Sequence, residues 1–216
     1  MTIRGAIFDL DGTLLDSMGI WDTLASAYLR TIGITPRPNV DYAVRALSME
    51  EAAQYLIREY GVSRTVPEVV REVSALIAAF YRERVLLKPG AAALLAAFAR
   101  SGVKICAATS GNRELASAAL ARCGVLSYFQ RIWTCSEIGY GKDSPAIYEA
   151  ACACLGTPVH ETAVFEDALY ALRTAKAAGF FTVAVADPSA ADDREALKNA
   201  ADIYLEALTD WENIHG

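Results

Sequence analysis

Apolar and polar positions follow two different periods along the chain. Near the start, and again from about residue 104, short apolar runs have the character of buried strands, and helical stretches separate the later runs. We predict strands at 3–8, 104–108, 131–135, 162–165 and 181–186 and helices at 90–100, 112–123, 144–156 and 167–178. This alternation predicts an α/β fold, a doubly wound parallel sheet with right-handed crossovers.

The stretch from residue 17 to residue 86 has a helical period and no convincing strand. One predicted stripe contains Ile20, Trp21, Leu24, Tyr28 and Ile32. Ser48 and Glu51 have the spacing of a capping box, and Pro67 is placed to open a later helix. Three or four such helices make a small bundle. We therefore predict a helical domain at 17–86, inserted into a core of residues 1–16 and 87–216.

Composition places the chain among globular proteins. Hydrophobic residues make up 54% of the 216 positions and charged residues 21%, a balance that disfavours disorder. The formal net charge of −6 provides no basic footprint for nucleic acid or anionic lipid. No apolar run approaches the ~18 residues of a membrane span. We expect neither a nucleic-acid partner nor a membrane partner.

The N-terminal residues run straight into the first predicted strand, which leaves no room for a signal peptide. The five cysteines lack the spacing of metal ligands, and we interpret them as small buried apolar residues in a reducing compartment. Two histidines make a histidine metal site or a serine triad improbable. We expect a cytoplasmic protein that is a monomer or a weak dimer.

The first apolar run ends in two carboxylates, Asp9 and Asp11. Gly12 favours a turn directly after them, which would fold the loop carrying Asp11 over Asp9. Asp-Gly is a common turn signal and explains Asp11 well, but it explains Asp9 poorly because Asp9 ends a buried strand. Crowded carboxylates repel each other, and a divalent cation with oxygen ligands is the usual counter-charge.

Polar residues follow the other predicted strands as well. Thr109 and Ser110 end the second, Lys142 comes after the third, and Glu166 and Asp167 end the fourth. Each has a plainer explanation, since hydroxyls and acids cap helices and a single lysine is usually solvated. Ligands of open sheets, however, bind beyond the carboxyl ends of the strands. The conjunction of these signals favours one common site.

The set suits phosphoryl transfer. Asp9 would act as nucleophile and form an aspartyl phosphate, while Asp11 acts as general acid and then as general base. Mg²⁺, held by Asp9, Asp167 and Glu166, would offset the repulsion between nucleophile and phosphate.

Three further groups would bind the phosphate of the substrate. The hydroxyl of Thr109, the amide of Ser110 and the ammonium of Lys142 would hold the charge of the transferring group. An inserted helical domain next to the nucleophile suggests a lid that expels water.

These residues resemble the haloacid dehalogenase superfamily over essentially the whole chain. The run Asp9-Leu10-Asp11-Gly12-Thr13 matches the first motif, DxDGT, and Thr109, Lys142 and Glu166-Asp167 match the other three. The resemblance implies a Rossmann-like core and Mg²⁺-dependent transfer through an aspartyl phosphate, with the backbone carbonyl of Asp11 as a further metal ligand. The insertion resembles the helical cap of the subgroup of phosphoglycolate phosphatases and beta-phosphoglucomutases.

The chain departs from the pattern of the family at three positions. Relatives usually have a small hydroxyl residue and a glycine where this chain has Ala168 and Ala171. A bond that orients the metal-binding acids is then missing, which would weaken metal affinity. Asp143 stands where proline is common; it could pair with Lys142, reach toward the metal, or be an ordinary solvated residue.

The resemblance leaves two reactions open, hydrolysis and phosphomutation. Mutases that resemble this chain carry a cap arginine where we align Met49, which favours a phosphatase for a small phosphorylated metabolite of the sugar or polyol type. Arg45 and Arg82 lie near enough in sequence to keep the mutase as an alternative. Candidate cap residues that face the substrate are Asp16, Met18, Trp21, Ser48 and Met49.

A phospho-receiver signalling module is a remote third possibility, because it also combines acids, magnesium, a hydroxyl residue and a lysine. Its phospho-acceptor should end the third strand. The residues there are Trp133-Thr134-Cys135-Ser136, without an aspartate.

Overall fold

The computed structural model describes residues 2–45 and 47–211. The chain forms two compact units, Met1–Ser17 with Val85–Gly216 and Met18–Arg84. The junctions lie within two residues of those expected from the sequence, and the assignment of core and cap roles stays a prediction. Within the described ranges, no helix combines the length and the apolar character needed to cross a bilayer.

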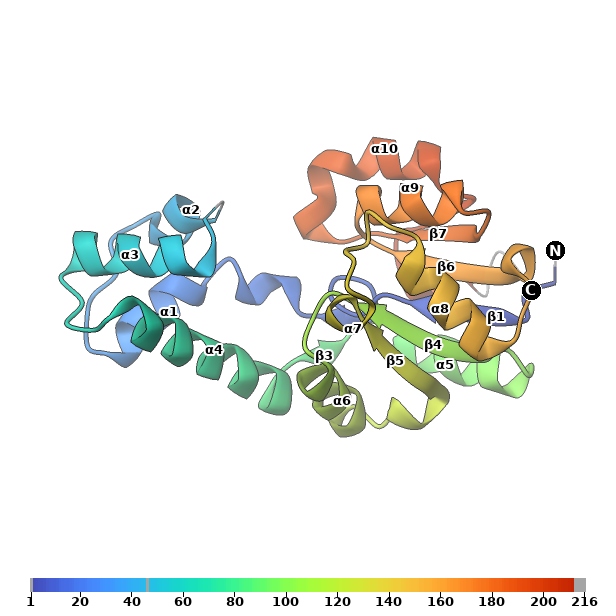
Figure 1. The fold of residues 1–216 in the computed structure, drawn as a ribbon, viewed down its shortest axis with the longest axis horizontal. Coiled ribbons are helices and arrows are strands. Elements are labelled where there is room, and N and C mark those ends of the chain that lie inside the picture. Colours follow the sequence, from blue (N-terminus) through green and yellow to red (C-terminus); the bar gives the residue numbers. More distant parts are fainter. Residues whose placement is uncertain (1, 46, 212–216) are drawn as a thin grey trace. The chain divides into compact units, whose positions relative to one another are not determined.

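The first unit is built on a six-stranded parallel sheet with the order β5-β4-β1-β6-β7-β8 (Figure 1). Its strands are β1 Gly5–Phe8, β4 Lys104–Thr109, β5 Phe129–Thr134, β6 Thr162–Glu166, β7 Phe181–Val185 and β8 Ile203–Leu205. β1 pairs in parallel with both β4 and β6. The strand order reverses around β1, so its carboxyl end is the switch point where ligands of such sheets bind. The predicted α/β fold is confirmed.

Helices cover both faces of this sheet (Figure 1). They are α5 Ala91–Arg100, α6 Arg113–Arg122, α7 Cys135–Ile138, α8 Ala146–Leu155, α9 Leu169–Ala177 and α10 Arg194–Ala200. Ile7 of β1 packs with Tyr148 and Leu155 of α8, whereas Phe8 packs with Phe98 of α5. Successive strand residues point to opposite faces. β1 is therefore buried on both sides, as its continuous apolar run requires.

Several local elements differ from the sequence prediction. β5 ends at Thr134, and Cys135 begins α7 because Thr134 and Glu137 form a capping box. β8 was missed because a strand of three residues is too short to show a period, and α10, with seven residues, was missed as well. Cys154 is exposed, so the expectation of buried cysteines is wrong for this one. A small antiparallel ribbon pairs β2, Leu15–Asp16, with β3, Leu86–Leu87.

In the part of the second unit that the structure describes, four α-helices pack around their own apolar core. They are α1 Leu24–Thr31, α2 Val40–Val44, α3 Met49–Tyr60 and α4 Val66–Glu83. The predicted capping box of Ser48 and Glu51 opens α3. The prediction that Trp21 lies on the apolar stripe of α1 is wrong, because Trp21 precedes this helix. A 3-10 turn at Met18–Ile20 precedes Trp21, and the Trp21 side chain is 45% exposed.

Four aromatic rings form a cluster in the first unit, on the face of the sheet covered by α5. The ring of Phe8 stacks on that of Phe165 with 4.3 Å between centroids. The ring of Trp211 lies 5.3 Å from both Phe98 and Phe165. The cluster joins the two strands that carry acidic residues at their ends to a helix and to the C-terminal segment. It should therefore fix the relative positions of β1 and β6.

We expect Phe165→Ala to lower the free energy of unfolding by about 3–5 kcal/mol, because a fully buried ring leaves a cavity. Urea unfolding measures the change. The control is Tyr140→Ala, at a side chain that is 64% exposed, which should change stability by less than about 0.5 kcal/mol. A loss below about 1 kcal/mol for Phe165→Ala would show that the cluster does not hold the strands together.

Candidate active site

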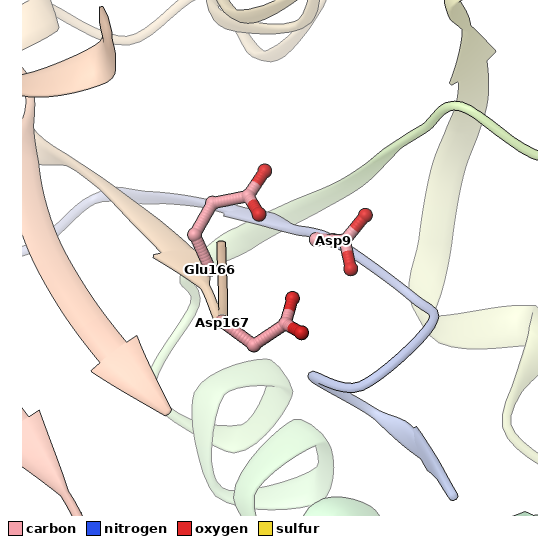
Figure 2. A group of neighbouring side chains, drawn as sticks. All are labelled: Asp9, Glu166 and Asp167. Atoms are coloured by element: carbon pink, nitrogen blue, oxygen red, sulfur yellow. The ribbon is translucent and has the colours of Figure 1, made fainter. Parts of the chain in front are cut away.

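Three buried carboxylates meet at the carboxyl ends of β1 and β6. The Asp9 amide donates to the Phe165 carbonyl at 3.0 Å, which continues the pairing of the two strands and brings Asp9 beside Glu166. Asp167 follows directly. Figure 2 shows the three side chains gathered around one space, and one oxygen of each lies within 4.8 Å of the others. The structure therefore brings together the three predicted metal-binding side chains.

A tight loop follows Asp9 and carries Asp11. The Leu10 carbonyl accepts hydrogen bonds from the amides of Thr13, Leu14 and Leu15, at 3.3, 3.0 and 2.7 Å. Gly12 has a φ of 84°, a conformation that favours glycine, so the predicted turn is present.

The two aspartates of this loop have different surroundings. The Ser17 hydroxyl donates to the Asp11 carboxylate at 2.6 Å, and Asp11 is half-buried. Asp9 is buried among acids. The pair is unequal, as the proposed division into nucleophile and proton carrier requires.

Lys142 is the positive charge at the centre of the cluster. Its ammonium donates to Asp9 and, at 2.6 Å, to Glu166, and the side chain is buried. It is not the solvated surface lysine of the plainer explanation. The Tyr148 hydroxyl donates to the same Glu166 oxygen, Oε1, at 2.7 Å. Glu166 thus accepts hydrogen bonds from two side chains: Lys142, in the segment before α8, and Tyr148, in α8 itself.

Two hydrogen-bond donors to the acidic cluster, Tyr148 and Thr13, were missed in the sequence. Tyr148 gave no signal, because a buried aromatic residue in a helix looks like ordinary core. Thr13 lies within the first motif, and its buried hydroxyl donates to Asp167 at 3.3 Å. Asp167 therefore has an orienting partner although Ala168 offers none. Ala171 is fully buried in α9.

A second loop, after β4, carries the predicted phosphate-binding residues. Thr109 is buried and its hydroxyl oxygen accepts the Gly111 amide at 2.9 Å, which leaves the hydroxyl hydrogen to donate elsewhere. Ser110 is exposed, with its hydroxyl 3.5 Å from the Cys135 sulfur. A Cβ on Gly111 would lie 3.2 Å from the Thr109 hydroxyl oxygen and 3.3 Å from an Asp11 oxygen. The glycine lets the two loops approach closely.

Burial dominates the electrostatics of the cluster. It raises the pKa of Asp9, against the lowering effect of Lys142. Burial raises the pKa of Glu166 to about 8 and that of Asp167 to about 7, again more than the ammonium can offset. Burial alone would lower the pKa of Lys142, but Asp9 and Glu166 raise it above its ordinary value. One ammonium does not balance three carboxylates.

The residues present fit a divalent cation. The second oxygen of Glu166, Oε2, is buried and has no hydrogen-bond partner within the described residues. With all groups ionised, the three carboxylates and Lys142 leave two negative charges, which one divalent ion would balance. Hard carboxylate oxygens are the ligands that Mg²⁺ prefers. Whether the Asp11 carbonyl joins them stays a prediction.

The predicted substrate residues of the cap fall into two groups. Trp21 and Met49 line one apolar pocket of about 160 Å³ in the helical unit, together with Arg45. The others do not line it: Asp16 is exposed in β2, Met18 lies in a 3-10 turn, and the Ser48 side chain caps α3. Asp143 is exposed, whereas Lys142 pairs with Asp9 and Glu166, so the suggested Lys142–Asp143 pair is not formed.

Comparisons with known proteins indicate the family of the chain. The family model described as haloacid dehalogenase-like hydrolase matches residues 3–179. The chain is 30% identical to validoxylamine A 7'-phosphate phosphatase of Streptomyces hygroscopicus subsp. limoneus, covering 97% of each chain. It is also 30% identical to hexitol phosphatase A of Escherichia coli, covering 96% of this chain and 93% of the relative.

A solved structure with a similar fold comes from Thermotoga maritima and is provisionally named a beta-phosphoglucomutase. Its TM-score is 0.86 at 21% identity, with 98% of this chain and 100% of the other covered. At that identity the likeness extends to the fold and not to the reaction.

The raised pKa values predict how magnesium and pH act together. Glu166 and Asp167 stabilise the metal-free fold while protonated, below about pH 4, and this stabilisation is lost as pH rises through about 7 to 8. A metal ion must displace those protons, so it binds better at high pH. We expect saturating Mg²⁺ to raise Tm by about 5–10 °C near pH 8.5 and much less near pH 5.5. Thermal unfolding, with potassium chloride at equal ionic strength as control, measures this; equal shifts at both pH values would contradict it.

Proposed function

We propose that this chain, which belongs to the haloacid dehalogenase-like hydrolase family, is a Mg²⁺-dependent phosphatase acting on a small phosphorylated metabolite of the sugar or polyol type. The observation that carries the proposal is the buried cluster of Asp9, Glu166 and Asp167 around Lys142. Relatives named as phosphatases for validoxylamine A 7'-phosphate and for hexitol phosphates support the substrate class. Membership in a hydrolase family argues against the receiver-module alternative.

In the first step, an Asp9 carboxylate oxygen attacks phosphorus and the bond to the leaving oxygen breaks. The Thr109 hydroxyl, the Ser110 amide and the Lys142 ammonium hold the phosphoryl oxygens, because negative charge is spread over them in the transition state. Asp11 gives its proton to the leaving oxygen, so a neutral alcohol departs and an aspartyl phosphate remains on Asp9. The hydrogen bond from Ser17 orients the Asp11 carboxylate for this transfer.

In the second step, water attacks the phosphorus of the phospho-enzyme. Asp11, now ionised, takes a proton from that water, and Asp9 leaves as a carboxylate. The cycle returns both aspartates to their starting protonation states. This use of one group as acid and then as base explains why Asp11 stands in a half-buried, more polar setting than Asp9.

Asp9, Glu166 and Asp167, with the Asp11 carbonyl, would hold the Mg²⁺ ion. When bound, the ion neutralises the negative charge of the nucleophile and phosphate that would otherwise repel each other. Thr13 and Tyr148 keep Asp167 and Glu166 in place for it.

We assign substrate selection to the helical unit, residues 17–86, as a cap. The pocket with Trp21 and Met49 supports this, because Arg45 adds a polar group to its mainly apolar lining. The cytoplasmic location and the monomeric or weakly dimeric state remain predictions from the sequence.

Asp9→Asn should abolish magnesium-dependent hydrolysis of para-nitrophenyl phosphate, with a loss of about 10³-fold or more in kcat, because an amide cannot act as the nucleophile. Asp143→Asn is the matched control, since Asp143 is an exposed aspartate next to Lys142. It should leave kcat and the magnesium requirement unchanged. An Asp9→Asn variant that keeps wild-type turnover would refute the assigned nucleophile.

A sugar phosphomutase is the second candidate, because Arg45 lines the same pocket as Met49, the position we align with the mutase arginine. A mutase should convert a hexose 1-phosphate to the 6-phosphate when a bisphosphate activator is supplied. We expect inorganic phosphate and no 6-phosphate, as measured by a coupled dehydrogenase assay. If wild-type protein isomerises the substrate and Arg45→Ala does not, the phosphomutase becomes the preferred function.

A further inference from the structure

Lys88 is half-buried beside the loop that carries Asp11, and it is absent from the set of motif residues. It follows β3, and its backbone amide donates to the Leu14 carbonyl at 2.8 Å. Its ammonium donates to the carbonyl of Gly12 and, at 2.8 Å, to that of Ala186 at the end of β7. It also forms an ion pair with Asp187 at 2.7 Å. The Lys88 and Asp187 side chains are 12% and 2% exposed.

The ammonium uses its three donors on three oxygens, two carbonyls and one carboxylate. This is the environment of a bound cation, with the ion tethered to the chain by the lysine stem. Asp187 is held in turn by the amide and hydroxyl of Ser189, at 2.9 and 2.6 Å. Its charge is therefore fixed in position and compensated, as a buried carboxylate requires.

The bond to Gly12 reaches the catalytic groups through one peptide unit. The Gly12 carbonyl belongs to the peptide that links Asp11, through glycine, to Thr13. The Thr13 amide of that same peptide donates to the Leu10 carbonyl at 3.3 Å, and the Thr13 hydroxyl donates to Asp167. Lys88 thus holds one side of a peptide whose other side is held by the loop itself.

We propose that Lys88, paired with Asp187, is a positioning residue. Its ammonium holds the Gly12–Thr13 peptide in place, and through that peptide it keeps Asp11 and Asp167 in the positions that catalysis needs. The part of this proposal that concerns turnover rests on the proposed phosphatase function. The part that concerns metal binding does not, because Asp167 belongs to the carboxylate cluster whatever the reaction. Removing the ammonium would leave three acceptors without their donor and free the loop.

The experiment compares Lys88→Met, which keeps the stem, with Lys88→Ala, which opens space for an added ion. In Lys88→Met we expect kcat for para-nitrophenyl phosphate to fall roughly 10- to 100-fold with KM within about twofold of wild type, since a small misplacement of catalytic groups acts on the transition state. The Mg²⁺ concentration that gives half of the thermal shift should rise about threefold or more. Ethylammonium should restore kcat in Lys88→Ala about fivefold or more, whereas ethanol at the same concentration should not.

Lys176→Met is the matched control. Lys176 also pairs with an aspartate, Asp202, which accepts bonds from Thr182 at the amino end of β7, the opposite end from Asp187. This variant removes a lysine–aspartate pair that lies near the other end of β7, without touching the catalytic loop. Its kcat and magnesium response should match wild type, with any change confined to stability.

An unchanged kcat and magnesium response in folded Lys88→Met would overturn the proposal. If that variant does not fold, Asp187→Asn decides: a fall in kcat of about threefold or more at constant KM supports it, and wild-type values overturn it. Failure of the phosphatase assignment is recognised separately, because wild-type protein would then show no turnover. Lys88-dependent magnesium shifts without turnover would leave the positioning role standing and remove the proposed function.

Discussion

The site depends on one electrostatic constraint, the confinement of three carboxylates in a buried space with a single ammonium. Lys142 contacts Asp9 and Glu166 directly and makes their burial tolerable, yet its one charge leaves the cluster short of neutrality. Breaking such a group by removing its cation is costly, because unpaired charge remains in a medium of low polarity. The incomplete compensation suits the proposed divalent cation, whose charge would balance the remaining two carboxylates.

The parallel sheet supplies the geometry that this constraint needs. Because β1 lies between β4 and β6, residues that end three strands distant in sequence become neighbours at one edge of the sheet. Burial of β1 on both faces, against α8 and against the aromatic cluster, fixes the direction in which Asp9 leaves the sheet. Stability of the core and precision of the site therefore have the same source.

The sequence predicts those parts of the site that follow from strand order. Asp9, Thr109, Glu166 and Asp167 could be found because each stands directly after a short apolar run, and parallel strands end at one edge. Residues that support the site only through contacts with positions distant in sequence could not be found in this way. Tyr148 has the pattern of an ordinary core residue, although its hydroxyl binds Glu166. Lys88 binds two backbone carbonyls, and a sequence pattern does not show which side chain a backbone carbonyl will bind. Short elements such as β8 escape for a similar reason, since three residues carry no period.

The small ribbon of β2 and β3 has a consequence for how far the helical insertion can vary. Leu15 pairs with Leu87 and Asp16 with Leu86, so the chain leaves the first unit and returns to it at adjacent points. A reverse turn between Asp16 and Leu86 would close the same ribbon without disturbing any strand of the large sheet. The helical insertion is in this sense interchangeable: it can be lengthened, remodelled or exchanged while the acids at the strand ends stay in place. The insertion, to which we assign substrate selection, can then change without altering the acids that we assign to the chemistry.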